Sequence, residues 1–332
     1  MRAVLRERLR DHLVQVALLA IVLWVVWRGV SNFLGNLRAL GVSAGYGFLH
    51  AEAGFEIAQA LIAFSPASSY LDAVIVATLN SLLVIALASV IGTLIALGIA
   101  FGRLTSQPLI RGASTAYVEV FRNIPLLLQI FFWYFSAMAL LPGVADSLQL
   151  GPVLLNNRGL FLPRLEITLQ GLLPQHFALD LPRAEGFNVS GGLALLPELM
   201  ALTLGLSIYN STFLAEIFRA GILSVPRGQT EAAATVGLSG VRAALLITLP
   251  QALRVALPPA AGQYQTLAKA SALAAAIGYP DIMQIVGGTV LSQTSQALEA
   301  MTLVVLLYAA INLGIALLVN LANRRLLKHD GR

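Results

Sequence analysis

Several ionisable side chains lie within otherwise apolar stretches of the sequence, and the four candidates for a functional role are Glu119, Arg122, Glu216 and Lys269. Charges inside a membrane are costly, so they usually face a partner or a water-filled cavity. Glu119 and Arg122 are three residues apart and can pair on one face of a helix. Lys269 can meet a substrate carboxylate, or it can pair with Glu216 or Glu119. The four charges therefore indicate either a polar lining for a zwitterionic substrate or ion pairs that hold helices together.

Uncharged polar side chains occur in the same apolar stretches, and the candidates among them are Asn80, Gln129, Asn210 and Ser271. Amides and hydroxyls at such positions can hydrogen-bond from one helix to another. The same groups can also contact a polar substrate. Together with the four charges, they make up the candidate residues of a substrate pathway.

Catalytic and metal-binding chemistry finds no support in the sequence. It contains no cysteine, which excludes thiolate metal ligands and cysteine nucleophiles. The four histidines lie outside the apolar stretches, which excludes a histidine metal site inside a membrane. A phosphate-binding loop requires lysine after glycine, but the only two lysines, Lys269 and Lys328, follow Ala268 and Leu327. We therefore expect this chain to hydrolyse no ATP and to bind no metal or cofactor.

The elements that must position these residues are membrane-spanning helices. Of the 332 residues, 58% are hydrophobic and 11% are charged, whereas soluble domains carry about 25% charged residues. Apolar stretches long enough for a span of about 20 residues, or close to it, are Leu13–Trp27, Ala73–Phe101, Gly112–Leu141, Leu193–Ile222, Val255–Tyr279 and Ala300–Asn323. The predicted fold is an all-α integral membrane protein with about six spans. The first stretch could instead be a signal peptide, but no small-residue cleavage site follows it, which favours an uncleaved span.

The distribution of basic residues predicts the orientation of the chain. Of 21 Lys and Arg residues, 14 fall in the segments on one side of the six stretches and five on the other, with Arg122 and Lys269 inside spans. Cytoplasmic segments carry the excess of Lys and Arg, so both termini are predicted to be cytoplasmic. This placement explains the net charge of +5 without a nucleic-acid partner.

The segments between the spans divide the chain. Residues 1–70 are predicted to form an N-terminal span and an extracytoplasmic segment, and residues 71–325 the main transmembrane domain. Within that domain, residues 142–192 contain five prolines, which disfavour a long helix and indicate an irregular or β-like extracytoplasmic insert. Residues 223–254 form a cytoplasmic loop and residues 326–332 a cytoplasmic tail.

The cytoplasmic loop has the pattern of a short helix whose surface is formed by small side chains. Pro226 or Thr230 can begin the helix, and Glu231 in its first turn suits the positive end of the helix dipole. Alanines follow, and Gly237 is placed where a helix ends in the left-handed conformation. Such a helix can enter a groove on another protein. A helix lying on the lipid surface is the alternative, but it requires large apolar residues on one face.

This loop resembles a family motif. Glu231-Ala232-Ala233, Gly237 and Ile247-x-Leu249-Pro250 match the EAA loop of ABC importer permeases. The runs Ala215–Ile222 and Ser224–Gln229 resemble its amino-acid branch. Upstream, Phe121-Arg122-Asn123-Ile124-Pro125-Leu126-Leu127 is similar to the F-R-G-T-P-L-L run of that branch, with Asn for Gly and Ile for Thr. The additional N-terminal span and the long insert resemble the Q/B-type permeases of general L-amino-acid importers.

The resemblance implies a type I importer of polar L-amino acids such as glutamate, glutamine, aspartate and asparagine, in the bacterial inner membrane. Two permease subunits, here a heterodimer with a homologous chain, form the pathway. Two ABC ATPase subunits bind ATP and Mg²⁺, and a periplasmic binding protein delivers the amino acid. The expected contacts with the ATPase are Arg227, Gln229, Glu231, Ala232, Ala233 and Gly237.

The alternative is a secondary transporter driven by an ion gradient. Such proteins use broken helices around a site at the midplane of the bilayer. Pro125, Pro258 and Pro259 can break helices, but the sequence shows no inverted repeat. The EAA-like loop would also have no purpose in a secondary transporter.

Overall fold

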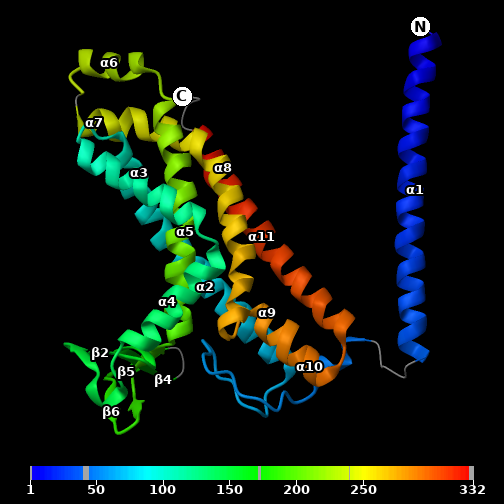
Figure 1. Ribbon diagram of the computed structural model, residues 1–332, viewed down its shortest axis with the longest axis vertical. Helices are drawn as coiled ribbons and strands as arrows, with labels where there is room; N and C mark the ends of the chain where they lie inside the picture. The colour runs from blue at the N-terminus through cyan, green and yellow to red at the C-terminus, as the bar shows by residue number, and fades with distance from the viewer. Residues whose placement is uncertain (1, 40–44, 171–172, 239, 329–332) are drawn as a thin grey trace.

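The computed structural model describes residues 2–39, 45–170, 173–238 and 240–328, and these residues are mainly helical (Figure 1). The longer helices are α1 (Arg2–Ala39), α2 (Tyr70–Leu104), α3 (Pro108–Asn123), α4 (Leu126–Leu140), α5 (Pro197–Leu223), α6 (Arg227–Thr235), α8 (Leu249–Ala270) and α11 (Ala297–Lys328). Short helices are α7 (Val241–Ala243), α9 (Ile282–Gln284) and α10 (Leu291–Thr294). Turns of 3₁₀ or π-helix occupy Tyr46–His50, Val144–Asp146, Ala244–Thr248, Ser271–Ile277 and Ile285–Val290.

The number of candidate spans agrees with the sequence. Within the described ranges, five helical segments are long and apolar enough to cross a membrane, and the bent pair α3–α4 makes six if it counts as one span. The prediction of about six spans is therefore confirmed. Helix α2 has 35 residues and is about 52 Å long at 1.5 Å per residue. Because a bilayer core is about 30 Å thick, α2 must tilt or extend beyond it.

The predicted third span is sharply bent. Pro125 stands between α3 and α4, whose axes differ in direction by 101°. Proline has no N–H to donate and forces the preceding residue into an extended conformation, as Ile124 shows with φ −86° and ψ 125°. Two carbonyls freed at the end of α3, those of Phe121 and Ile124, accept hydrogen bonds from Gln129 Nε2 at 2.7 and 3.0 Å.

Two other spans begin at different residues from those predicted. Residues Leu193–Leu195 form strand β8, and α5 starts only at Pro197. Helix α8 starts at Leu249, before the predicted Val255. Pro197 begins α5, where the missing N–H costs nothing. Helix α8 has Pro250 as its second residue and continues the π-helical turn Ala244–Thr248. Pro258 and Pro259 lie inside α8 without ending it.

The predicted insert is built of short antiparallel strands. Strands β1 (Leu148–Leu150), β2 (Val153–Asn156), β3 (Gly159–Leu162) and β8 form a sheet in the order β1-β2-β3-β8. Strands β4 (Arg164–Gln170) and β5 (Leu173–Asp180) form one ribbon, and β6 (Arg183–Glu185) and β7 (Asn188–Ser190) another. Of the two structures that the prolines allowed, the β-like one is present.

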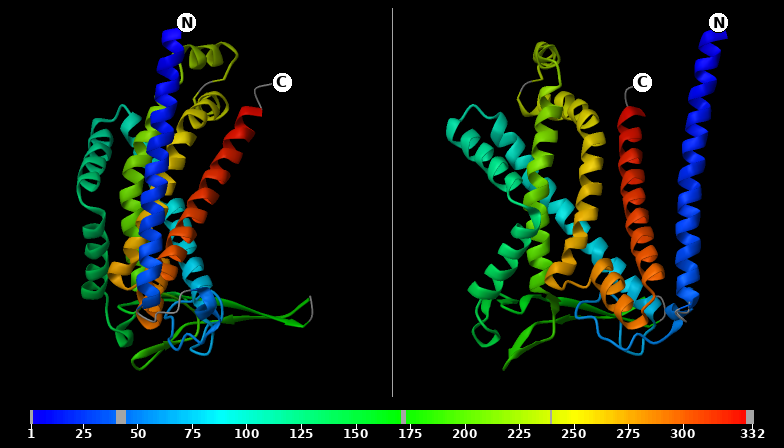
Figure 2. Two further views of the ribbon diagram at one scale, coloured as in Figure 1. Left: turned by 90° about the vertical axis from the view of Figure 1, so that its right-hand side faces the viewer. Right: turned by 45° about the vertical axis from the view of Figure 1, so that its right-hand side comes forward.

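The two ends of the bundle carry different elements. Helix α6, the start of α1 and the end of α11 lie at one end, and the strands, α9 and α10 lie at the other (Figures 1 and 2). Residues 326–328 of the predicted tail belong to α11, and residues 329–332 lie outside the described part of the chain. Helix α1 stands apart from the bundle, and the apolar side chains of residues 13–30 are exposed.

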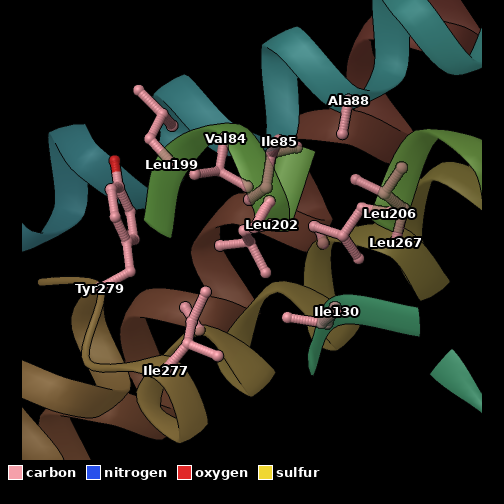
Figure 3. Close-up of a cluster of buried hydrophobic side chains, with 13 residues drawn as sticks. Val84, Ile85, Ala88, Ile130, Leu199, Leu202, Leu206, Leu267, Ile277 and Tyr279 are labelled. Atoms are coloured by element: carbon pink, nitrogen blue, oxygen red, sulfur yellow. The ribbon is translucent and has the colours of Figure 1, made fainter. Parts of the chain in front are cut away.

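The core lies where α2, α4, α5 and α8 meet. Leu202 of α5 is surrounded by Val84, Ile85, Ile130 and Leu267, which point toward it from three other helices (Figure 3). Small residues bring the backbones close elsewhere. A Cβ atom on Gly92 of α2 would lie 3.2 Å from the Ser207 carbonyl oxygen of α5. Close backbone approach of this kind stabilises helix pairs in membranes.

Candidate functional site

Helix α6 has the start and the end that the sequence predicts. Pro226 is its N-cap, and Gly237 follows it with φ +80°. The Leu238 N–H donates to the Ala233 carbonyl at 2.9 Å, and the Gly237 N–H donates to the Ala234 carbonyl at 3.1 Å. These two bonds form a Schellman motif, in which a left-handed glycine satisfies the last carbonyls of a helix. The stop after α6 therefore depends on Gly237.

The exposed face of α6 contains most of the predicted coupling residues. Arg227, Gln229, Glu231 and Ala232 are exposed, as is Gly237. Ala233 differs, because only 5% of its surface is exposed, and α6 packs against the π-helical turn at Ala244–Thr248. Ala233 is therefore buried within this chain, unlike the other predicted contact residues.

A short, hydrogen-bonded linker joins α6 to α5. The Ser224 N–H donates to the Ala220 carbonyl at 3.0 Å, and the Ser224 hydroxyl donates to the Gly221 carbonyl at 2.7 Å. Only Ser224, Val225 and Pro226 separate the two helices. Helix α6 is therefore held close to the end of α5.

The predicted pairing of the charged residues is wrong. Arg122 donates instead to the Thr212 carbonyl at 2.9 Å and lies over the Phe213 ring, 4.8 Å from its centroid. Glu216 pairs with Arg103 of α2 and with Arg219 on its own helix. Glu119 is exposed on α3. Thus neither glutamate is the partner of Lys269.

Three of the predicted polar residues connect parts of the chain. Asn80 is fully buried, and its Nδ2 donates to the Gln59 and Pro280 carbonyls at 2.8 and 2.9 Å. Gln129 spans the break between α3 and α4, as described above. The Ser271 hydroxyl donates to the Ala268 carbonyl at 2.8 Å. Each of the three side chains thus has a hydrogen-bond partner on the backbone of this chain.

Asn210 lines a small cavity between α4, α5 and α8. Its Oδ1 accepts a hydrogen bond from Gln263 Nε2 at 2.8 Å, and its buried Nδ2 has no partner within the described chain. The cavity is about 10 Å³, enough for a water molecule and too small for an amino acid. Gln263 was missed from the sequence, although it is a polar residue on a mainly apolar helix.

Lys269 lies on a different face of α8. It is exposed and lines an open groove of about 480 Å³ between α8 and α11, together with Gln265, Tyr308 and Asn312. Lys269 is the one charged residue among the described lining residues. Residues 263 and 265 are two apart, about 200° around a helix, so the groove and the Asn210 cavity face opposite sides of α8.

Asp281, at the strand-bearing end of the molecule, was not predicted. It is 1% exposed, caps α9 by accepting the Gln284 N–H at 2.8 Å, and accepts the Tyr308 hydroxyl at 2.8 Å. Burial raises the pKa of Asp281 to about 6, although these two hydrogen bonds oppose the rise. Asp281 thus links the segment after α8 to α11.

Replacement of Asp281 by Asn tests this burial. A carboxyl whose pKa is higher in the folded state contributes stability at low pH that is lost as the pH rises from about 4 to about 6. Asn retains the N-cap but cannot ionise. Thermal unfolding in detergent should therefore show Asp281→Asn gaining up to about 3 kcal/mol relative to the parent between pH 4 and pH 7. Asp146→Asn, at an exposed carboxyl, is the control; an equal gain there would contradict the assignment.

Comparison with known proteins agrees with this arrangement. Residues 92–328 match the family described as binding-protein-dependent transport system inner membrane component. The chain is 39% identical to the putative amino-acid ABC transporter permease protein YhdX of Escherichia coli, with 97% of this chain and 94% of that protein covered. It is 36% identical to the general L-amino acid transport system permease protein AapQ of Rhizobium johnstonii, with 96% and 92% covered.

A solved structure shares the fold. The crystal structure of an amino acid ABC transporter with histidines superposes with a TM-score of 0.55 at 25% identity, covering 77% of this chain and 95% of that one. The family match extends over α5, α6, α8 and α11, which include the exposed helix α6 and the Lys269 groove. The chain therefore belongs to the binding-protein-dependent transport system inner membrane components, the membrane-spanning permease subunits of ABC importers.

Proposed function

We propose that this chain forms half of the pathway of an importer for polar L-amino acids, with α6 as its contact to the ATPase. As a member of its family, it is a non-catalytic membrane subunit that works with separate ATPase subunits and a substrate-binding protein. The observation that carries the proposal is α6 itself, a short helix at one end of the bundle with Arg227, Gln229, Glu231 and Ala232 exposed. Its small residues suit a groove on the ATPase.

The groove beside Lys269 is the proposed part of the pathway that meets the substrate. Every L-amino acid carries a carboxylate, and an ammonium group is a favourable partner for it. Gln265 and Asn312 add amide groups, which suit polar side chains. Asn80, Gln129, Arg122 and Glu216 instead connect segments outside the groove. Ser271 bonds within its own turn, and Glu119 is exposed on α3.

A second, homologous permease is the proposed partner at the open side of the groove. An exposed lysine within a span cannot face lipid without a large cost. A heterodimer would cover Lys269 and close the groove into a pathway. The name of the relative AapQ, a general L-amino acid permease, supports a polar and broad substrate class.

The bundle is proposed to sit in the bacterial inner membrane with α6 and both chain ends in the cytoplasm. The Lys and Arg distribution favours this orientation, and α6 shares its end of the bundle with the start of α1 and the end of α11. The strands of residues 142–192 and the segment 45–69 then lie on the outer side, where the amino-acid-binding protein docks. In this proposal, residues 1–70 form an N-terminal domain and residues 71–325 form the main transmembrane domain.

Reconstitution into proteoliposomes tests the proposal. The permease pair with its ATPase should hydrolyse ATP faster when the binding protein and a polar L-amino acid are added, and uptake should require ATP. A panel of the twenty amino acids identifies the substrates. Uptake driven by an ion gradient in the absence of the ATPase would instead support a secondary transporter.

A further inference from the structure

A cluster of charges joins α2 to α5 near the end of the bundle that carries α6. Glu216 of α5 accepts a hydrogen bond from Arg103, in the last turn of α2, and another from Arg219 Nε at 3.1 Å. Glu216 lies two turns before the end of α5, and the linker to α6 follows directly. One carboxylate thus holds two arginines, one of them from another span.

The Arg103–Glu216 pair is expected to contribute little to stability. The two side chains are 17% and 28% exposed, so their attraction is offset by lost hydration, and apolar residues of similar size would stabilise the site equally well. Such pairs instead fix one element relative to another. Loss of Glu216 alone would be more harmful, because Arg103 and Arg219 would remain without their anion.

An apolar contact between α2 and α5 surrounds the charges. Ala96 and Ala100 of α2 pack against Leu214 and Ala215 of α5, and the contact between these two helices is the most extensive in the described chain. Beyond Ala100, Phe101 is exposed. Arg103, in the last turn of α2, adds an ion pair to this apolar contact.

We propose that Arg103 and Glu216 are positioning residues for coupling, which make the end of α2 follow α5 when α6 is displaced. This inference rests on the proposed contact between α6 and the ATPase. Displacement of α6 reaches α5 through Ser224–Pro226, and the ion pair passes it to α2. The pair stays formed throughout the transport cycle, so that α2 and α5 move together.

Charge variants test the pair through the amount of amino acid imported per ATP hydrolysed. Glu216→Gln should lower this ratio about tenfold, because it leaves two arginines uncompensated, and Arg103→Gln should lower it less. The exchanged variant Arg103→Glu/Glu216→Arg should restore most of the ratio, since the carboxylate introduced at position 103 again lies beside a guanidinium, now at position 216. Arg111→Gln, at an exposed arginine of α3, is the matched control. An exchanged variant as defective as Glu216→Gln would overturn the proposal.

Covalent linkage tests whether the pair stays formed. The chain has no cysteine, so Arg103→Cys/Glu216→Cys introduces the only two thiols. This variant should be uncoupled. A short bis(methanethiosulfonate) reagent, which forms a disulfide with each cysteine and releases methanesulfinate, should restore coupling until the disulfides are reduced. Crosslinked protein that hydrolyses ATP without transport would show that the two helices separate, against the proposal. If instead α6 is not the ATPase contact, Gly237→Arg will leave coupling intact, whatever the crosslinked variant does.

Discussion

Replacement of Gly237 by arginine should abolish coupled amino-acid uptake while leaving insertion into the membrane intact. Gly237 has φ +80°, a conformation that costs an L-residue roughly 1–2 kcal/mol. The strain loosens the Schellman motif that ends α6, and the substitution places a long cation at the exposed end of α6, on the proposed ATPase contact. In proteoliposomes, we expect that ATP hydrolysis stimulated by the binding protein will no longer be accompanied by amino-acid uptake.

Two matched variants separate the helix stop from other effects. Gly237→Asn should retain most of the uptake, because asparagine tolerates the left-handed conformation. Gly112→Arg adds the same side chain to an open helical position of α3, where no atom lies within 4 Å of the added Cβ, and should also retain uptake. If Gly237→Arg imports amino acids at the parental rate per ATP, the coupling role of α6 is wrong.

The signals that predicted α6 are local, which is why they succeeded. A proline at the start, alanines in the middle and a glycine at the stop act through backbone geometry within about a dozen residues. The same holds for the insert, where prolines exclude helix. Which strands pair, and that Leu193–Leu195 joins β3, depends on contacts between distant residues, and the sequence pattern alone does not specify them.

The partners of the buried polar groups could not be predicted for the same reason. Glu216 lies in an apolar stretch, and the sequence pattern allowed it to pair with Lys269. In the structure, the Glu216 side chain on α5 instead faces Arg103 of α2. Pro125 signalled an interrupted helix, yet the 101° bend also needs Gln129 to bind the freed carbonyls. Asp281 lies in a short stretch between spans, where hydropathy gives no sign that a carboxylate is buried.

Lys269→Met should lower uptake at least about tenfold, since a hydrogen bond to a charged group contributes about 1.5–3 kcal/mol and each 1.4 kcal/mol is about tenfold. Methionine keeps much of the length of the side chain and removes the charge from the groove. Because Lys269 is exposed and has no acidic neighbour among the described lining residues, its loss should leave thermal unfolding in detergent nearly unchanged. Lys269→Arg keeps the charge and should keep part of the uptake.

Asn210→Ala is expected to change stability more than uptake, the opposite of Lys269→Met. The comparison of the two variants therefore separates a substrate contact from a structural one. This variant removes the buried hydrogen bond to Gln263 on the other face of α8, so it should lower the unfolding temperature and affect uptake less. Uptake is measured across several polar amino acids, because a carboxylate contact must affect them all alike. If Lys269→Met lowers the unfolding temperature by several degrees but transports normally, Lys269 holds helices together. The substrate would then have to pass elsewhere.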